Sequence, residues 1–163
     1  MSSLALVTGA SSGIGKAFAE RLAADGYDLI VVGRRKDRLD ALAESVSGTT
    51  VRVVVADLAS SEGLQSVLDV AADQPVDLLV NNAGVAHYMP FAALPEQKAR
   101  ELLAVKVTAP TLLAHAVTPG MIERDSGTII NVAGMLAFGG PASASPPPAQ
   151  RAIYTGTLAY TVA

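Results

Sequence analysis

Residues 7–15 read Val-Thr-Gly-Ala-Ser-Ser-Gly-Ile-Gly, a glycine-rich turn that follows a short apolar run and opens an amphipathic run at residues 16–23. A strand, a glycine-rich turn and a helix in this order predict a phosphate site. The reason is that a helix N-terminus presents unpaired N–H groups and the positive end of the helix dipole. A plain turn between a strand and a helix is the alternative. The spacing Thr-Gly-x-x-x-Gly-x-Gly after the first strand of an α/β chain favours dinucleotide binding.

Each of the three glycines has its own predicted role. Gly9 lets the chain leave the strand in a sharp turn, and Gly13 lets a pyrophosphate approach the backbone because it has no Cβ. Gly15 lets the new helix pack close to its strand. Three hydroxyl groups can add hydrogen bonds to the turn or to phosphate oxygens, and they belong to Thr8, Ser11 and Ser12.

The composition of the 163 residues predicts a single domain, residues 1–163, with a core of Val, Leu, Ile and Ala. Half of the residues are hydrophobic and only 4% are aromatic, which suits a parallel sheet covered by helices on both faces. The net charge of −3 gives no support to nucleic-acid binding. No apolar run is expected to span a membrane, and the N-terminus lacks the pattern of a signal peptide.

Cysteine and histidine usage limits the chemistry further. The absence of cysteine excludes disulfides and thiol catalysis, and it fits a cytoplasmic protein. The two histidines lie far apart in the sequence without clustered ligands, so no metal site is predicted.

Strand-like and helix-like runs alternate along the chain. The predicted strands cover residues 4–8, 28–33, 51–57, 78–81 and 128–132. The predicted helices cover residues 14–25, 36–45, 62–72, 95–123 and 151–163. Repeated strand–helix units predict the α/β class, a doubly wound parallel sheet with right-handed crossovers.

Basic residues follow the second predicted strand. Arg34, Arg35 and Lys36 stand where a dinucleotide fold meets the adenosine ribose, and no Asp or Glu stands at that strand end. A carboxylate there would bind the ribose 2′-hydroxyl and favour NAD, whereas arginines suit a 2′-phosphate. The pattern therefore favours NADP(H) over NAD. A solvated basic start to the next helix is the alternative.

Polar residues also follow the third and fourth predicted strands. Asp57, followed by Leu58, can accept a hydrogen bond from an adenine amino group, or it can cap the next helix in competition with Ser60 and Ser61. Residues 81–84 read Asn-Asn-Ala-Gly, and their amides can bridge neighbouring strand ends or bind a ribose. A polar turn is the alternative for this segment.

Apolar residues of the fourth predicted helix wrap more than one side. One side is expected to meet the sheet, and the other is a candidate subunit interface. Pro110 falls inside this helix and should kink or divide it. His115, in the same helix, is interpreted as structural, whereas His87 is expected in a surface loop or at a substrate mouth.

Taken in order, these motifs resemble those of the short-chain dehydrogenase/reductase family. Residues 8–15 resemble its cofactor loop, Asp57 its adenine-binding aspartate, residues 81–84 its Asn-Asn-Ala-Gly motif, and Arg34 its NADP-preferring pattern. The resemblance begins at residue 4 and extends to the end of the chain. The cofactor-binding residues that it implies are Gly9, Ser11, Ser12, Gly13, Ile14, Gly15, Arg34, Arg35, Asp57, Leu58, Asn82, Ala83 and Gly84.

The catalytic set of the family is only partly matched. The family uses a Tyr as general acid or base toward a carbonyl or alcohol, with a Lys, a Ser and an Asn around it. Tyr154 resembles this tyrosine and opens a Tyr-x-x-x-Lys pattern, but Leu158 replaces the lysine. Gly134 replaces the serine and Lys106 the asparagine. Without a cation near it, Tyr154 is expected to be a poor base at neutral pH, and Lys106 is a candidate to return a positive charge to the site.

The chain is also short for the family, whose members continue through two more strands and a substrate-covering segment. We therefore expect a truncated product, a fragment or a natural short form that lacks the C-terminal strands. In each case the fifth strand is expected to be a sheet edge unless a partner covers it.

Three functions are consistent with the sequence. The first is an NADP(H)-dependent oxidoreductase that moves a hydride to or from a carbonyl or secondary alcohol, in a cytoplasmic homo-oligomer (dimer or tetramer). The second is a catalytically impaired nucleotide-binding homologue that acts as a sensor or partner subunit. The third is an unstable fragment without a function of its own.

Overall fold

The computed structural model describes residues 2–134, which form a five-stranded parallel sheet in the order β3-β2-β1-β4-β5. The strands are β1 Leu4–Thr8, β2 Asp28–Gly33, β3 Val51–Val55, β4 Val76–Asn81 and β5 Thr128–Asn131. The helices are α1 Gly13–Ala24, α2 Lys36–Ser45, α3 Ser61–Ala72, α4 Glu96–Leu103 and α5 Ala109–Glu123, with a 3₁₀ turn η1 Phe91–Ala93 and a π-helical turn η2 Ala104–Thr108. The predicted α/β class is confirmed. The last predicted helix, residues 151–163, lies outside the described residues.

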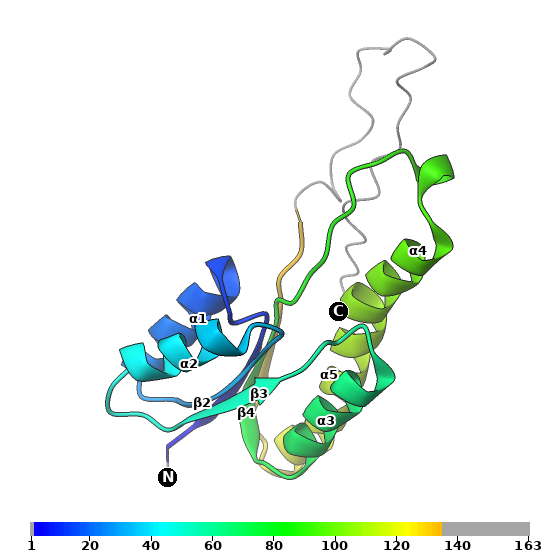
Figure 1. Ribbon diagram of the computed structural model, residues 1–163. Helices are drawn as coiled ribbons and strands as arrows, with labels where there is room; N and C mark the ends of the chain where they lie inside the picture. Colours follow the sequence, from blue (N-terminus) through cyan, green and yellow to red (C-terminus); the bar gives the residue numbers. More distant parts are fainter. Residues whose placement is uncertain (1, 135–163) are drawn as a thin grey trace, which may run out of the picture.

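Helices cover both faces of the sheet, with α1 and α2 on one face and α3 and α5 on the other (Figure 1). Successive strand residues point to opposite faces, so β1 contributes Leu6 to one core and Val7 to the other. The first core joins Leu6 to Leu79 of β4 and to Leu113 of α5. Because the central strands are buried on both faces, they are rich in Val, Leu and Ile.

The boundaries of three strands differ from the prediction. The third strand ends at Val55 instead of residue 57, because Asp57 starts a turn in which its carbonyl oxygen accepts a hydrogen bond from Ser60 N at 3.0 Å. The fourth strand starts earlier than predicted, at Val76, and the fifth ends one residue earlier, at Asn131. Within the described chain β5 lies at the sheet edge, as expected.

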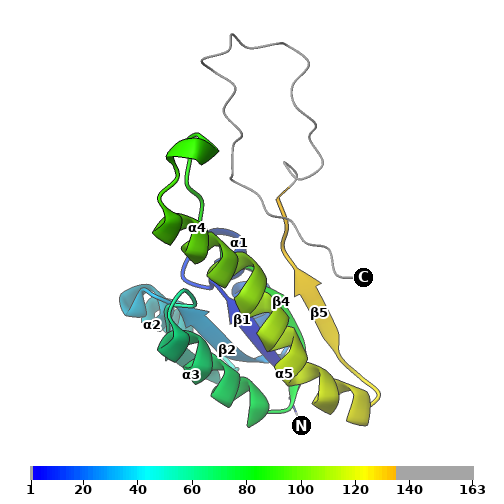
Figure 2. The same cartoon turned by 90° about the vertical axis from the view of Figure 1, so that its right-hand side faces the viewer.

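The fourth predicted helix is continuous but changes its winding. α4, η2 and α5 run without a break from Glu96 to Glu123, and Figure 2 shows them as one rod across the sheet beside β5. The π-helical turn η2 ends two residues before Pro110, whose missing N–H and bulky ring disturb ordinary α-helical hydrogen bonding. The proline therefore divides the helix by a change of hydrogen-bond pattern.

One side of this rod is buried, and the other carries exposed apolar residues. The buried side consists of Leu102, Val105, Ala109, Leu113, Val117 and Met121. Leu103, Leu112 and Ile122 are exposed. The predicted contact of one side with the sheet is confirmed. Burial of the other side in a subunit interface stays a prediction.

The apolar character on both sides corrects one expectation. The segment from Glu96 to Glu123 is long and apolar enough to cross a membrane by length and composition alone, although no such run was expected from the sequence. A core helix of a sheet protein meets the same criteria. Packing of α5 against α3 and β4 is consistent with that role.

The α5 packing predicts a clear contrast between two neighbouring leucines. Leu113 is fully buried and Leu112 is 39% exposed. Leu113→Ala should lower the free energy of unfolding by about 2–5 kcal/mol, because it leaves a cavity in the core. Leu112→Ala should cost less than about 1 kcal/mol. Urea unfolding followed by circular dichroism measures both changes, and equal losses would contradict this packing.

Candidate cofactor site

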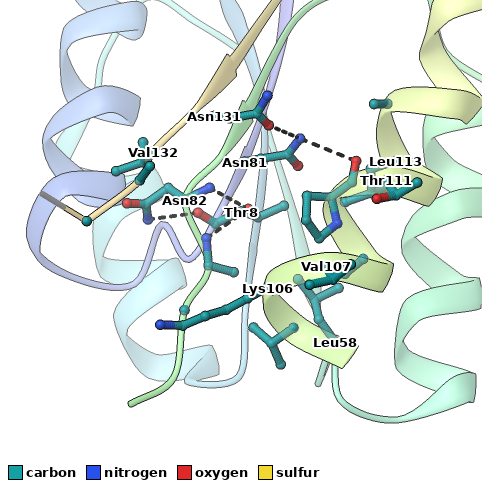
Figure 3. Close-up of a pocket in the computed structure, with 18 residues that line it drawn as sticks. Thr8, Leu58, Asn81, Asn82, Lys106, Val107, Thr111, Leu113, Asn131 and Val132 are labelled. Atoms are coloured by element: carbon teal, nitrogen blue, oxygen red, sulfur yellow. Dashed lines mark hydrogen bonds between the residues drawn. The ribbon is translucent and has the colours of Figure 1, made fainter. Parts of the chain in front are cut away.

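A reciprocal set of hydrogen bonds between Thr8 and Asn82 joins the glycine-rich turn to the end of β4. Thr8 Oγ1 accepts from the backbone N–H groups of Asn82 and Ala83, both at 3.0 Å, and donates to Val80 O at 3.2 Å. Asn82 Nδ2 in turn donates to Thr8 O at 3.0 Å and to Gly9 O at 3.4 Å. Figure 3 shows this pairing at the centre of the site. The partners of the Thr8 hydroxyl thus lie at the end of β4, and none of its hydrogen bonds is to the glycine-rich turn, where the sequence predicted them.

Two glycines of the turn have no room for a side chain. Gly9 has a φ of +69°, and an added Cβ would lie 2.8 Å from Asn82 Nδ2. Gly15 faces both the Gly9 carbonyl and the Asn82 amide too closely for any side chain. The sequence predicted that Gly15 lets the helix pack close to its strand. The structure shows that Gly15 instead lies close to the turn and to Asn82.

Gly13 has the property that a phosphate-binding turn needs. Its φ is +55°, and an added Cβ would meet no described atom within 4 Å. The backbone at Gly13 is thus open toward the space above the N-terminus of α1. The N-cap residue Ser12 makes no side-chain capping hydrogen bond there, so the first N–H groups of α1 can bind an anion.

Arg35 lies directly beside this helix N-terminus. Its Nη2 donates to Ser11 Oγ at 2.9 Å and to Ser12 Oγ at 2.7 Å. These hydrogen bonds hold the end of β2 against the glycine-rich turn. The sequence predicted that both segments bind the cofactor, but it did not predict that they contact each other. A guanidinium at this point adds positive charge where a phosphate would be bound.

These elements surround an outer cavity of about 440 Å³ at the carboxyl ends of the strands. Most of the predicted cofactor-binding residues line it, namely Gly9, Ser11, Ser12, Ile14, Arg34, Arg35, Asp57, Leu58, Asn82, Ala83 and Gly84. Gly13 and Gly15 are not among the lining residues of this cavity, and their contact with the cofactor stays a prediction. The structure therefore brings together residues from four separate segments.

The structure decides between the two alternatives for the helix cap near Asp57. Ser60 is the N-cap of α3, and its Oγ accepts from Gly63 N at 3.0 Å. Asp57 Oδ1 accepts from Ala59 N at 3.0 Å, which stabilises the turn before the helix. Asp57 is not the cap, and its exposed carboxylate stands on the outer cavity. An adenine contact stays a prediction.

An inner cavity of about 390 Å³ lies between β4, β5 and α5 (Figure 3). Asn81 and Asn131 are paired in the strand register, and Asn81 Nδ2 donates to Asn131 Oδ1 at 3.0 Å. The predicted bridging of strand ends by amides is confirmed at this pair. Asn81 Oδ1 is buried and has no hydrogen-bond partner among the described residues, so it offers an acceptor at the cavity wall.

Asn131 was not singled out from the sequence. The available signal was an asparagine near the end of the predicted strand at residues 128–132, next to a strand that ends in Asn81. Adjacent carboxyl ends of parallel strands form the ligand edge of such a sheet. The register that pairs the two residues became apparent only in the folded chain.

His87 is placed away from both cavities. Its Nε2 lies 3.0 Å from Glu101 Oε2 of α4, and Lys98 Nζ lies 3.2 Å from the same oxygen. These neighbours lower the pKa of Glu101, with the Lys98 hydrogen bond as the largest cause. His115 is exposed on α5. No cluster of three or more metal-binding side chains occurs within residues 2–134.

Comparison with known proteins agrees with this geometry. The family described as short chain dehydrogenase matches residues 3–149. The chain belongs to the short-chain dehydrogenase/reductase family. The oxidoreductase family and the doubly wound α/β fold predicted from the sequence, a Rossmann-like fold, are thereby confirmed.

Two curated relatives illustrate the range within this family. The human protein named inactive hydroxysteroid dehydrogenase-like protein 1 is 33% identical over 162 residues, which cover 96% of this chain and 47% of that protein. A very-long-chain 3-oxoacyl-CoA reductase of Phaeosphaeria nodorum is 36% identical over 148 residues, which cover 83% of this chain and 42% of the reductase. This chain thus spans about half the length of the curated relatives it matches.

Solved structures of family members are also similar. A short-chain dehydrogenase from Sphingobium yanoikuyae in complex with NADPH is 38% identical, with a TM-score of 0.81 over 84% of this chain and 56% of that one. L-Sorbose reductase from Gluconobacter frateurii, complexed with NADPH and L-sorbose, is 35% identical, with a TM-score of 0.77 over 83% of this chain and 54% of that one.

The positions that resemble the family's catalytic set are divided between the described and undescribed parts of the chain. Gly134 and Lys106 both line the inner cavity. Tyr154 and Leu158 lie outside the described residues. The structure therefore brings two of the replaced positions into one cavity and does not place the tyrosine.

The Thr8 hydroxyl predicts a specific stability pattern. Thr8 is 2% exposed, and Thr8→Val keeps its shape but removes the acceptor for two partly buried N–H groups. We expect a loss of about 1–3 kcal/mol for each unsatisfied group in the free energy of unfolding. Thr8→Ser keeps the hydroxyl and should recover most of this loss. Chemical unfolding checks the pair, and a Val variant as stable as the wild type would refute the role.

Proposed function

We propose that this protein is an NADP(H)-dependent oxidoreductase that moves a hydride between the cofactor and a carbonyl or secondary alcohol. The observation that carries the proposal is the outer cavity, where an open glycine-rich turn, two arginines and Asp57 meet at the carboxyl ends of the strands. Such a crevice is the usual place for a dinucleotide in a doubly wound sheet. The proposed cytoplasmic location and homo-oligomeric assembly rest on the sequence alone.

The choice of NADP(H) over NAD(H) rests on the end of β2. Arg34 and Arg35 both line the outer cavity, and the strand end offers no carboxylate to a ribose 2′-hydroxyl. A guanidinium binds a phosphate through charge-assisted hydrogen bonds. The similar structures from Sphingobium yanoikuyae and Gluconobacter frateurii contain NADPH, which supports this preference.

Each part of the cofactor has its own proposed binding residues. Arg34 and Arg35 would bind the 2′-phosphate, and Asp57 the adenine amino group. The N–H groups at the start of α1 would bind the pyrophosphate. When bound, NADPH supplies the hydride. Tyr154 is proposed, from the family resemblance, to donate the proton to the carbonyl oxygen.

A second candidate function is cofactor binding without efficient turnover. It is favoured by Gly134, which lines the inner cavity without a hydroxyl to orient a carbonyl, and by Leu158, which provides no charge to Tyr154. The name of the human relative, inactive hydroxysteroid dehydrogenase-like protein 1, says that this relative is inactive. The two candidates share the cofactor site and differ only in the chemical step.

Calorimetric titration tests the shared part of the proposal. The wild-type chain should bind NADPH more tightly than NADH. The double variant Arg34→Ala with Arg35→Ala should lose about tenfold or more in NADPH affinity, because a hydrogen bond to a charged group contributes about 1.5–3 kcal/mol. Arg38→Ala removes an exposed arginine of α2 that does not line the outer cavity, and it should leave NADPH affinity unchanged.

A turnover assay separates the two candidates. NADPH oxidation with a panel of ketones and aldehydes should be measurable above the cofactor's background oxidation and should fall to that background in Tyr154→Phe. Saturable NADPH binding with no turnover would favour the second candidate. Binding of neither cofactor would overturn the proposal as a whole.

A further inference from the structure

Lys106 introduces a positive charge into an otherwise uncharged cavity. Of the described residues that line the inner cavity, it is the only one with an ionisable side chain. The rest of the lining is apolar or carries amides and hydroxyls, as on Asn81, Asn131 and Thr111. Burial lowers the pKa of Lys106, because desolvation disfavours the charged ammonium.

Lys106 also stands where the inner and outer cavities meet. Five residues line both cavities: Leu58, Asn82, Ala83, Gly84 and Val105. Lys106 directly follows Val105 in the chain, and its Cε would lie 3.9 Å from a Cβ built on Gly84. Figure 3 shows its side chain extending toward the segment that follows β4. A ligand that passes from the outer to the inner cavity would therefore pass close to its ammonium group.

The local backbone is consistent with a binding role. Lys106 is the central residue of the π-helical turn η2, between α4 and α5. Such turns insert a residue into a helix and are frequent at functional sites. Val105 is buried in the core, whereas Lys106 is partly exposed and reaches the cavity.

We propose that Lys106 binds the nicotinamide half of NADP(H), with its ammonium donating to oxygens of the nicotinamide ribose and the adjoining phosphate. The inference rests on the proposed cofactor site. The outer cavity already supplies Arg34, Arg35 and Asp57 for the adenosine half, and none of these three lines the inner cavity. The nicotinamide half is then the part that reaches Lys106. Lys106 would act as a binding and positioning residue for the cofactor.

Two ligands of different length test the role of Lys106 separately from the existence of the cofactor site. NADPH carries both halves, whereas 2′,5′-ADP carries only the adenosine half with its 2′-phosphate. Lys106→Met should weaken NADPH binding about tenfold or more in calorimetry of the full chain. It should leave 2′,5′-ADP affinity within about twofold, and Lys106→Arg should retain most of the NADPH affinity.

Lys98→Met is the matched control, since Lys98 is an exposed lysine of α4 that lines neither cavity. It should bind both ligands like the wild type. If Lys106→Met does not unfold cooperatively, Lys106→Gln provides the same comparison. Wild-type NADPH affinity in the uncharged variant, with normal 2′,5′-ADP binding, would overturn the inference alone. Failure of the wild type to bind either ligand would overturn the proposed function and the inference together.

Discussion

The hydrogen bonds between Thr8 and Asn82 are the interaction on which the rest of the site depends. They join the ends of β1 and β4, neighbours in the sheet that are separated by more than 70 residues in the chain. The same bonds hold the Gly9 carbonyl beside the Asn82 amide, which leaves room only for glycine at positions 9 and 15. One buried hydroxyl thus fixes the wall between the outer and inner cavities.

The parallel sheet determines which residues can meet at this wall. All five strands point the same way, so polar residues after β1, β2, β3 and β4 gather at one edge. The helices then supply the remaining parts. The start of α1 offers an anion site next to Arg35, and the π-helical turn before Pro110 carries Lys106 into the inner cavity.

The sequence predicted the elements more completely than the contacts. The glycine spacing and the apolar runs were enough for the sheet, because local backbone conformation and burial follow from local residues. Three contacts depend on strand register between distant segments. They are the Asn81–Asn131 hydrogen bond, the Arg35–Ser11 hydrogen bond and the hydrogen bond from Ala83 N–H to the Thr8 hydroxyl. No local pattern carries that information.

The helix around Pro110 shows the same limit in another form. Pro110 predicted a kink or a break in the helix. The structure instead has a π-helical turn within one continuous helix. A proline can be accommodated by a kink, a break or a wider turn, and packing of α5 on the sheet selects among them. The outer side of this helix carries the exposed apolar residues Leu103 and Ile122, and its role as a subunit interface stays a prediction.

The most direct test of this account is amide hydrogen exchange of the full chain with and without excess NADPH. The account predicts slower exchange on NADPH addition in two segments, residues 13–16 at the start of α1 and residues 82–84 after β4. Exchange in the middle of α3, which lies away from the lining of both cavities, should stay unchanged. Identical exchange in both segments, with and without NADPH, would contradict the claim that the Thr8–Asn82 wall forms a cofactor site.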